Sequence, residues 1–263
     1  VKYIGGYIFA QCTGLTSIEI PASVTSIGRD AFYGCGGLMS IVVDDGNTVY
    51  DSRTNCNAII ETATNTLVKG CNNTMIPYGV TSIGDGAFYN CDSLTYIDIP
   101  GSVTNIGTEA FMDCGSLASI EIPEGVTNIG GGAFKDCISL TSVVIPSTVT
   151  SIGNFAFESC IALTSIVSHI AAEDLFSPGD YVFDNVDKYA CTLYVPNGAK
   201  AAYAATDKWW DFTNIVESGA TDINNVVSEV SFDVPVYYDL SGRRVENPAS
   251  GIYIVNGKKV YIK

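Results

Sequence analysis

The single histidine is the first residue to consider for chemistry. His169 lies in a stretch without regular hydrophobic periodicity. General-base and triad chemistry requires a histidine beside a nucleophile and an acid, and no such set stands out around it. Gly130-Gly131-Gly132 is not a phosphate loop, because the Lys-Ser/Thr pair and the helix of that motif do not follow. We therefore expect no catalytic residues and no enzyme activity.

The nine cysteines could form disulfides or bind a metal. The interval of 23 residues between several of them does not match zinc-site spacing. Residues at one position of a repeat are expected to stack as small buried thiols, and six cysteines do so: Cys12, Cys35, Cys91, Cys114, Cys137 and Cys160. Cys56 and Cys71 lie outside this series and are the best candidates for a disulfide. Asp44-Asp45-Gly46-Asn47 lacks the remaining ligands of a calcium loop and indicates a turn. We predict no metal site and no cofactor.

The repeat that carries these cysteines predicts a solenoid of stacked coils. In the unit 117–137, the alternation around Ile120 and Ile122 predicts a short strand that Pro123 ends. A second extended stretch, 126–129, precedes a tight turn, and successive first strands should lie parallel. Phenylalanines at one repeat position are expected to form a single buried column of Phe32, Phe88, Phe111, Phe134 and Phe157, extended by Phe9 and Phe183.

Several segments depart from the period. Residues 43–76 are too long for one unit, and runs at 58–61 and 66–69 predict an enlarged coil with a protruding β-hairpin. Residues 168–217 should close the solenoid with a last strand at 193–196 and a helix over 199–210. The aromatic residues expected to cover its open end are Tyr203, Trp209, Trp210 and Phe212. The solenoid is thus assigned to 1–217, a polar linker to 218–225, and a small all-β module to 226–263, where Asn256-Gly257 is a strong hairpin turn.

The charge of the chain narrows the classes of partner. The net charge is −15, and residues 1–217 hold 23 acidic and 8 basic side chains. Nucleic acids and anionic lipid surfaces both require a basic footprint, so neither is an expected partner. No apolar run is long enough to cross a membrane. The sequence starts within a repeat, and we expect the native protein to begin upstream.

Outward-facing strand positions are the best candidates for binding. One such column contains Glu19, Asp98 and Glu121, and the adjacent column contains Tyr96 among serines. These four residues could form a shallow acidic strip with an aromatic anchor that attracts a basic protein segment. The alternative is an ordinary solvated sheet face, chosen for strand propensity and solubility.

The unit 117–137, with its Ile-Pro, Val-Thr-Asn-Ile-Gly and Ala-Phe-x-x-Cys segments, resembles the BspA-type leucine-rich repeat over roughly residues 1–217. The resemblance implies an α/β repeat fold, a leucine-rich repeat solenoid with 3-10 or loop returns. It also implies a bacterial surface or secreted protein of Bacteroidetes type that takes part in adhesion by binding a host matrix or bacterial surface protein. A glycan-binding module and a passive spacer without a ligand are the alternatives. The segments 238–245 and 251–255 are similar to C-terminal sorting modules of exported Bacteroidetes proteins.

Overall fold

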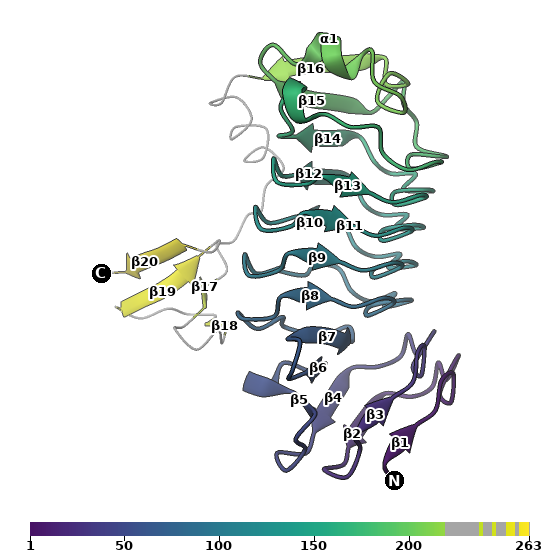
Figure 1. Ribbon diagram of the computed structural model, residues 1–263, viewed down its shortest axis with the longest axis vertical. Helices are drawn as coiled ribbons and strands as arrows, with labels where there is room; N and C mark the ends of the chain where they lie inside the picture. Colours follow the sequence, from purple (N-terminus) through teal and green to yellow (C-terminus); the bar gives the residue numbers. More distant parts are fainter. Residues whose placement is uncertain (219–236, 239–243, 246–250, 256–257, 263) are drawn as a thin grey trace.

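We analysed a computed structural model, which describes residues 1–218, 237–238, 244–245, 251–255 and 258–262. Residues 1–218 form a solenoid whose coils stack along the long axis of the molecule (Figure 1). A regular coil contributes a first strand, a second and shorter strand, and a return path made of turns. The predicted fold class, a solenoid of mostly short parallel strands, is confirmed.

The first strands form a parallel sheet whose register equals one repeat. Ser119 pairs with Ser142, and Ser142 pairs with Ser165. The sheet contains β10 (Ser119–Glu121), β12 (Ser142–Ile145), β14 (Ser165–Ser168), β15 (Thr192–Pro196) and β16 (Asn214–Ser218). In the N-terminal coils, β2 (Ser17–Ile20) and β4 (Ser40–Val43) form a separate parallel pair. Residues 94–99 carry no strand, so the expected continuous sheet is divided in two.

The second strands form a sheet of their own. Its members, in order, are β13 (Ser151–Ile152), β11 (Asn128–Ile129), β9 (Asn105–Ile106), β8 (Ser82–Ile83), β7 (Thr66–Lys69), β6 (Ile59–Glu61) and β5 (Tyr50–Asp51). At the N-terminus, β1 (Tyr3–Ile4) pairs with β3 (Ser26–Ile27). Because these strands hold only a few residues each, stacking of coils rather than strand length must provide the cooperativity.

The enlarged coil contains the expected hairpin, in which β6 and β7 run antiparallel. However, the expectation that this hairpin protrudes is wrong. β7 also pairs with β8 of the next coil, so the hairpin belongs to the second sheet. Ile59, Ile60 and Leu67 are fully buried. Ile59 and Ile60 pack into two different core clusters, which explains why the hairpin is held within the solenoid.

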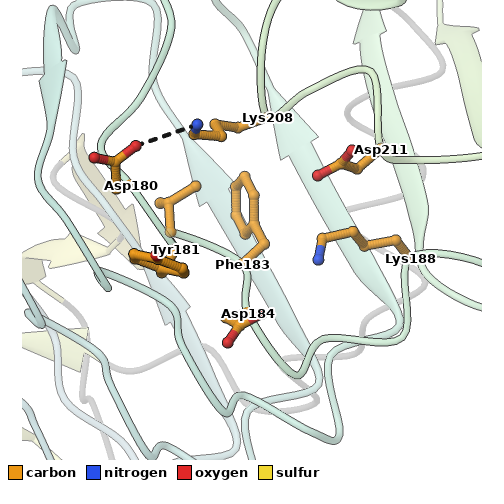
Figure 2. Close-up of a pocket in the computed structure, with 8 residues that line it drawn as sticks. Asp180, Tyr181, Phe183, Asp184, Lys188, Lys208 and Asp211 are labelled. Atoms are coloured by element: carbon orange, nitrogen blue, oxygen red, sulfur yellow. Dashed lines mark ion pairs between the residues drawn. The ribbon is translucent and has the colours of Figure 1, made fainter.

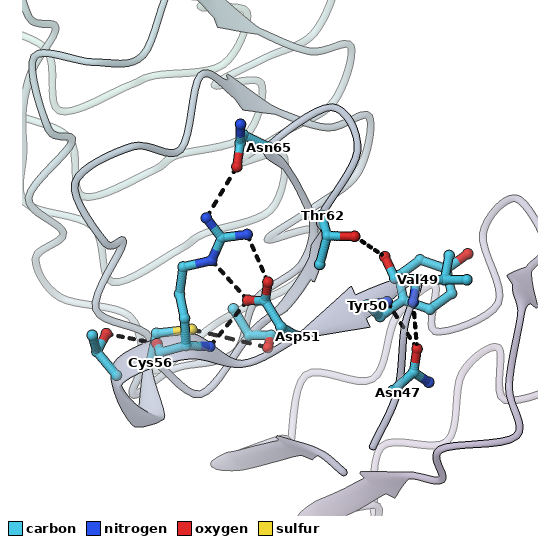
Figure 3. A network of polar contacts seen from close by, with 10 residues as sticks. Asn47, Val49, Tyr50, Asp51, Cys56, Thr62 and Asn65 are labelled. Carbon is cyan, nitrogen blue, oxygen red and sulfur yellow. Dashed lines mark hydrogen bonds and ion pairs between the residues drawn. The ribbon is translucent and has the colours of Figure 1, made fainter. Parts of the chain in front are cut away.

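An ion pair with an additional amide contact ties a 3-10 turn of the enlarged coil to the turn of its hairpin. Arg53, in the 3-10 turn η1 (Arg53–Asn55), donates to the two carboxylate oxygens of Asp51 at 2.8 and 2.6 Å. Its third contact is to the side-chain oxygen of Asn65 at 3.0 Å, at the turn of the hairpin (Figure 3). The hydrogen bond that Arg53 donates to Asp51 raises the pKa of the Arg53 guanidinium. Two-point contact of this kind holds both groups in one geometry.

Asn47 fastens the enlarged coil to the coil before it. Its Oδ1 accepts hydrogen bonds from the N–H groups of Val49 and Tyr50, both at 2.9 Å (Figure 3). Its Nδ2 donates to the carbonyl oxygens of Pro21 and Val24, also at 2.9 Å. All four bonds use the distinct donor and acceptor ends of the amide, so an asparagine is required at this position.

The phenylalanine column is present but divided. Five rings stack in sequence, with centroids 4.9 to 5.8 Å apart: Phe88, Phe111, Phe134, Phe157 and Phe183. Phe9 and Phe32 form a separate stacked pair at 5.4 Å. The division has a steric cause at Gly70 of the enlarged coil, where a Cβ atom would lie 2.2 Å from the Phe88 ring. The backbone of that coil therefore occupies the place where the preceding ring would stack.

The buried cysteine series is confirmed for all members except Cys12, which is exposed. The thiols of Cys114, Cys137 and Cys160 each point to the carbonyl oxygen of a phenylalanine in the preceding coil, as Cys137 does to Phe111 at 3.2 Å. The predicted disulfide between Cys56 and Cys71 is wrong, since both thiols are free and buried. They pack into different core clusters, on either side of the hairpin.

One turn position in each return path has a left-handed backbone. Its φ lies between 55° and 62° at Tyr7, Asp30, Gly86, Glu109, Gly132, Phe155 and Tyr181. Glycine adopts this conformation without the clash that a Cβ atom introduces, and bulky side chains adopt it only at a cost. The aromatic members of the series are therefore unusual.

The C-terminal end of the solenoid is closed, although not entirely as expected. Strand β15 is not the last, because β16 adds a further parallel strand beside it. The helix is limited to α1 (Lys200–Tyr203), and a 3-10 turn, η2 (Ala172–Asp174), lies in the excursion before it. Three of the four aromatic residues are buried as predicted: Tyr203, Trp209 and Phe212. Trp210 is 56% exposed, because in a turn its neighbour Trp209 takes the inward position.

The described part of the C-terminal segment forms an antiparallel sheet in the order β18-β17-β19-β20. These strands are β17 (Tyr237–Tyr238), β18 (Arg244–Val245), β19 (Gly251–Val255) and β20 (Lys258–Ile262). Val255 lies opposite Lys258, which agrees with a two-residue hairpin turn between them. The turn residues Asn256 and Gly257, and the linker after Ser218, lie outside the described residues.

Candidate partner-binding face

The outer face of the first-strand sheet brings together a row of side chains from successive coils. Glu121 is exposed on β10, between the buried Ile120 and Ile122. The strand register aligns it with Val144 on β12, and then with Val167, Tyr194 and Val216 on the next three strands. We call this row, together with Tyr96 and Asp98 of the preceding coil, the outer row.

Tyr96 and Asp98 keep the predicted outward direction without a strand ladder. Both are exposed, Tyr96 to 42%, while Ile97 and Ile99 between and after them are buried. The alternation of exposed and buried residues is that of a strand, although residues 94–99 make no strand pairing. The sequence pattern therefore identified the direction of these side chains correctly and their strand pairing incorrectly.

Asp98 and Glu121 interact electrostatically. The pKa of the Glu121 carboxyl is raised, first by partial desolvation and then by the negative charge of Asp98, while His169 acts in the opposite direction. Like charges held close together raise the pKa of a carboxyl group because they disfavour its ionised form. The outer row thus concentrates negative charge at its N-terminal end.

Glu19 is not part of this arrangement. It is exposed on β2, opposite Val42, in the separate strand pair of the N-terminal coils. The enlarged coil lies between that pair and the outer row. The structure therefore brings together three of the four predicted binding residues and leaves the fourth on another part of the surface.

Sequence reasoning missed Tyr194. Tyr194 occupies the outward position of β15, in line with Val167. The segment 193–196 matches the Ile-x-Ile-Pro part of the repeat, so an alignment of that segment would have placed Tyr194 in the outward column. Val167 is buried, although it lies in line with these outward positions. From Asp98 to Tyr194, the outer row hence changes from acidic, through apolar, to aromatic.

His169 takes part in no arrangement that suggests catalysis. Its Nδ1 lies 3.6 Å from a carboxylate oxygen of Glu124, and its backbone N–H donates to Ile145. Within the described ranges, no hydrogen bond joins its side chain to a serine, threonine or cysteine. The same part of the chain contains no group of three or more His, Cys, Asp or Glu residues placed to hold a metal ion.

Comparison with known proteins agrees with this architecture. The BspA-type leucine-rich repeat region matches in six copies, over residues 1–69 and 58–190. The chain belongs to the BspA-type leucine-rich repeat family. No curated protein sequence matched it. In the described portion of this BspA-type chain, we find no helix with the length and apolar character needed to span a bilayer.

Three solved structures are similar to this BspA-type chain. A leucine-rich cell surface protein from Faecalibacterium prausnitzii is 31% identical over 86% of this chain and 53% of its own, with a TM-score of 0.59. A leucine-rich repeat protein from Eubacterium ventriosum is 24% identical over 74% of this chain and 52% of its own, with a TM-score of 0.65. The pneumococcal vaccine antigen PcpA is 16% identical over 83% of this chain and 60% of its own, with a TM-score of 0.53. The last two are similar in fold alone, and the chain spans less than two thirds of each protein.

Proposed function

We propose that this BspA-type chain is a non-catalytic recognition module, displayed at the cell surface or secreted, that binds a protein partner through the outer row. The observation that carries the proposal is the composition of that row. Asp98 and Glu121 hold adjacent negative charges near one end, and Tyr194 offers an aromatic ring near the other. A partner segment with basic residues followed by apolar ones would complement both ends.

The similar cell surface protein from Faecalibacterium prausnitzii supports the proposed location. Repeat solenoids generally bind their partners over an extended regular face rather than in a deep pocket. A host extracellular-matrix protein or a surface protein of another bacterium is the proposed partner. Adhesion is the corresponding biological role.

Binding to immobilised extracellular-matrix proteins tests this proposal. We expect the double substitution Asp98→Lys/Glu121→Lys to weaken binding about tenfold or more, since reversal of two charges beside a basic segment replaces attraction with repulsion. Binding of the unaltered protein should also weaken as salt increases, because these charges are solvated. Glu19→Lys is the matched control, since it reverses one acidic charge on the separate N-terminal strand pair.

Equal binding by the double variant and the unaltered protein would show that the partner does not bind through the outer row. An equal loss in Glu19→Lys would indicate general electrostatic steering by the acidic solenoid instead of a defined face. Absence of binding to any matrix or bacterial surface protein would favour the passive spacer, whose effect would change gradually with the number of coils.

A further inference from the structure

The return-turn edge of the solenoid carries an exposed aromatic pair. The rings of Phe155 and Tyr181 are stacked, with centroids 5.2 Å apart and planes within 5° of each other. They are 38% and 61% exposed. Both residues occupy the left-handed turn position, with φ of 61° and 57°, where Gly86 and Gly132 stand in other coils. The chain thus accepts both backbone strain and exposed apolar surface here, a combination that is typical of functional positions.

The Phe155–Tyr181 stack is covered on its Phe155 side and open on its Tyr181 side. The ammonium group of Lys135 lies 5.5 Å from the centre of the Phe155 ring and also pairs with Glu158 at 2.6 Å. Phe155 is therefore flanked by Lys135 and by Tyr181. Within the described part of the chain, Phe155 is the only ring that contacts Tyr181. Further along the chain, Lys208 also has a left-handed backbone, with φ of 67°, and it carries an ammonium group instead of a ring.

A pocket of about 270 Å³ adjoins the last ring of the stack. It is lined by the pair's Tyr181 and by buried apolar groups of Val182 and Phe183. The polar lining comes from Asp180, Asp184, Lys188, Lys208 and Asp211. Figure 2 shows Asp180 and Tyr181 on one side of Phe183, and Lys188 and Asp211 on the other.

Only some of the charged groups that line the pocket form ion pairs with one another. Lys208 bridges Asp180 at 3.2 Å and Asp207 at 2.9 Å, so that one wall of the pocket is fixed. Lys188, Asp184 and Asp211 form no ion pair within the described ranges. The pocket consequently offers both donors and acceptors beside an aromatic surface.

We propose that this pocket and the Tyr181 ring form a binding site for a neutral glycan, with one pyranose ring seated beside Tyr181. The apolar C–H face of a sugar can pack on an aromatic ring, and its hydroxyl groups can both donate to carboxylates and accept from lysines. A wholly apolar ligand would leave the charged lining without partners at a cost in desolvation. The excess of acidic over basic groups, both in the lining and in the whole solenoid, disfavours anionic glycans.

A substitution at Tyr181 separates binding from folding. Tyr181→Gly removes the ring and relieves the left-handed strain, so the variant should fold at least as well as the unaltered protein. Tyr7→Gly is the matched control, because Tyr7 has the same turn position, a φ of 56° and 62% exposure, but lies at the other end of the solenoid. The probe is an array of immobilised oligosaccharides that includes neutral glucans, mannans, galactans and N-acetylhexosamine glycans, beside sialylated and sulfated ones.

We expect at least one neutral glycan to bind, and its affinity to fall about tenfold or more in Tyr181→Gly while Tyr7→Gly leaves it unchanged. Asp184→Asn and Lys188→Gln should each weaken binding of the same glycan, with thermal stability unaltered. The proposal is overturned if no neutral glycan binds, if only sialylated or sulfated glycans bind, or if Tyr181→Gly binds as well as the control. Asp98→Lys/Glu121→Lys should retain glycan binding, which separates this site from the outer row.

Discussion

Exchange of Asn47 for aspartate tests how the enlarged coil is fastened to the solenoid. Asn47→Asp keeps the shape of the side chain and the two acceptor contacts with the N–H groups of Val49 and Tyr50. It removes the two donor contacts to the carbonyl oxygens of Pro21 and Val24 and places a carboxylate oxygen against them. The substitution therefore changes the direction of two hydrogen bonds without changing the packing.

The expected loss of stability follows from these contacts. Each lost hydrogen bond contributes about 1 kcal/mol, and the carbonyl oxygens that lose their donors add a desolvation penalty of similar size. Asn47 is half-buried and Pro21 retains a backbone N–H donor from Val24, so water and this donor offset part of the penalty. We expect the free energy of unfolding to fall by about 2 kcal/mol at neutral pH. The same-turn control Asp45→Asn should have no effect, because no hydrogen bond to the exposed Asp45 side chain is present in the described structure.

The loss should depend on pH with a defined sign. A carboxylate that faces two carbonyl oxygens is disfavoured in the folded protein, which raises its folded pKa above the unfolded value. The electrostatic part of the destabilisation is then full above the folded pKa and is lost as the pH falls below the unfolded one, where the carboxyl is protonated in both states. One of the two donor contacts stays missing even there, because a protonated carboxyl has a single O–H group. Urea unfolding monitored by circular dichroism, with hydrogen exchange of peptides from 18–27 and 115–145, gives the size and the location of the effect.

We expect faster exchange in the N-terminal peptide alone, because Asn47 joins coils of the N-terminal core cluster. A change below about 0.5 kcal/mol at neutral pH would refute the reasoning, since surface substitutions without specific contacts already vary by that amount. Equal acceleration of exchange in both peptides would show that the coils unfold as one unit and that the contact has no local role.

Two further predictions concern ionisable groups. Because burial and Asp98 raise the pKa of Glu121, its carboxylate opposes folding at neutral pH, so Glu121→Gln should raise the melting temperature there. This gain should vanish below about pH 4, where the glutamate is protonated in both states, and a gain that persists in acid would contradict the assignment. In the native protein a thiol reagent should modify Cys12 rapidly and the other eight cysteines only after unfolding, because Cys12 alone is exposed and burial raises the pKa of Cys160 and Cys191 to about 12. Rapid reaction of more than one thiol per chain, measured by mass spectrometry, would count against the buried cysteine series.

Features that repeat were accessible from the sequence, and features made by a single interruption were not. The 23-residue interval placed the cysteines and phenylalanines correctly inside the regular coils, because residues at the same repeat position meet the same environment. Division of the phenylalanine column depends on Gly70 of the enlarged coil, whose backbone approaches Phe88. Nothing in the local pattern of residues 43–76 indicates that this backbone enters the core instead of leaving it.

In the candidate sites, too, the repeated features were predictable from the sequence and the features caused by an interruption of the repeat were not. Alternation along each strand predicted the outward direction of Tyr96, Asp98 and Glu121, since side-chain direction has a period of two. The separation of Glu19 from the other three was not predictable, because it follows from the enlarged coil between them. The Phe155–Tyr181 pair was not predicted, because the hydrophobic pattern of the sequence does not show which turn positions have a left-handed backbone.

Both proposed sites lie where this chain departs from what would be most stable for a regular coil. Each coil repeats the same core, so outward residues can vary with little effect on the fold, and a costly residue at such a position needs a reason. At the outer row the cost is electrostatic, since partial burial and then the charge of Asp98 raise the pKa of Glu121. At the return-turn edge the cost is conformational, since Tyr181 occupies a backbone position suited to glycine. The two costs are of different physical kinds, in different parts of the coil, so a partner at one site need not alter the geometry of the other. The two proposals together predict that a protein and a glycan bind as independent ligands, so substitutions at one site should leave affinity at the other unchanged.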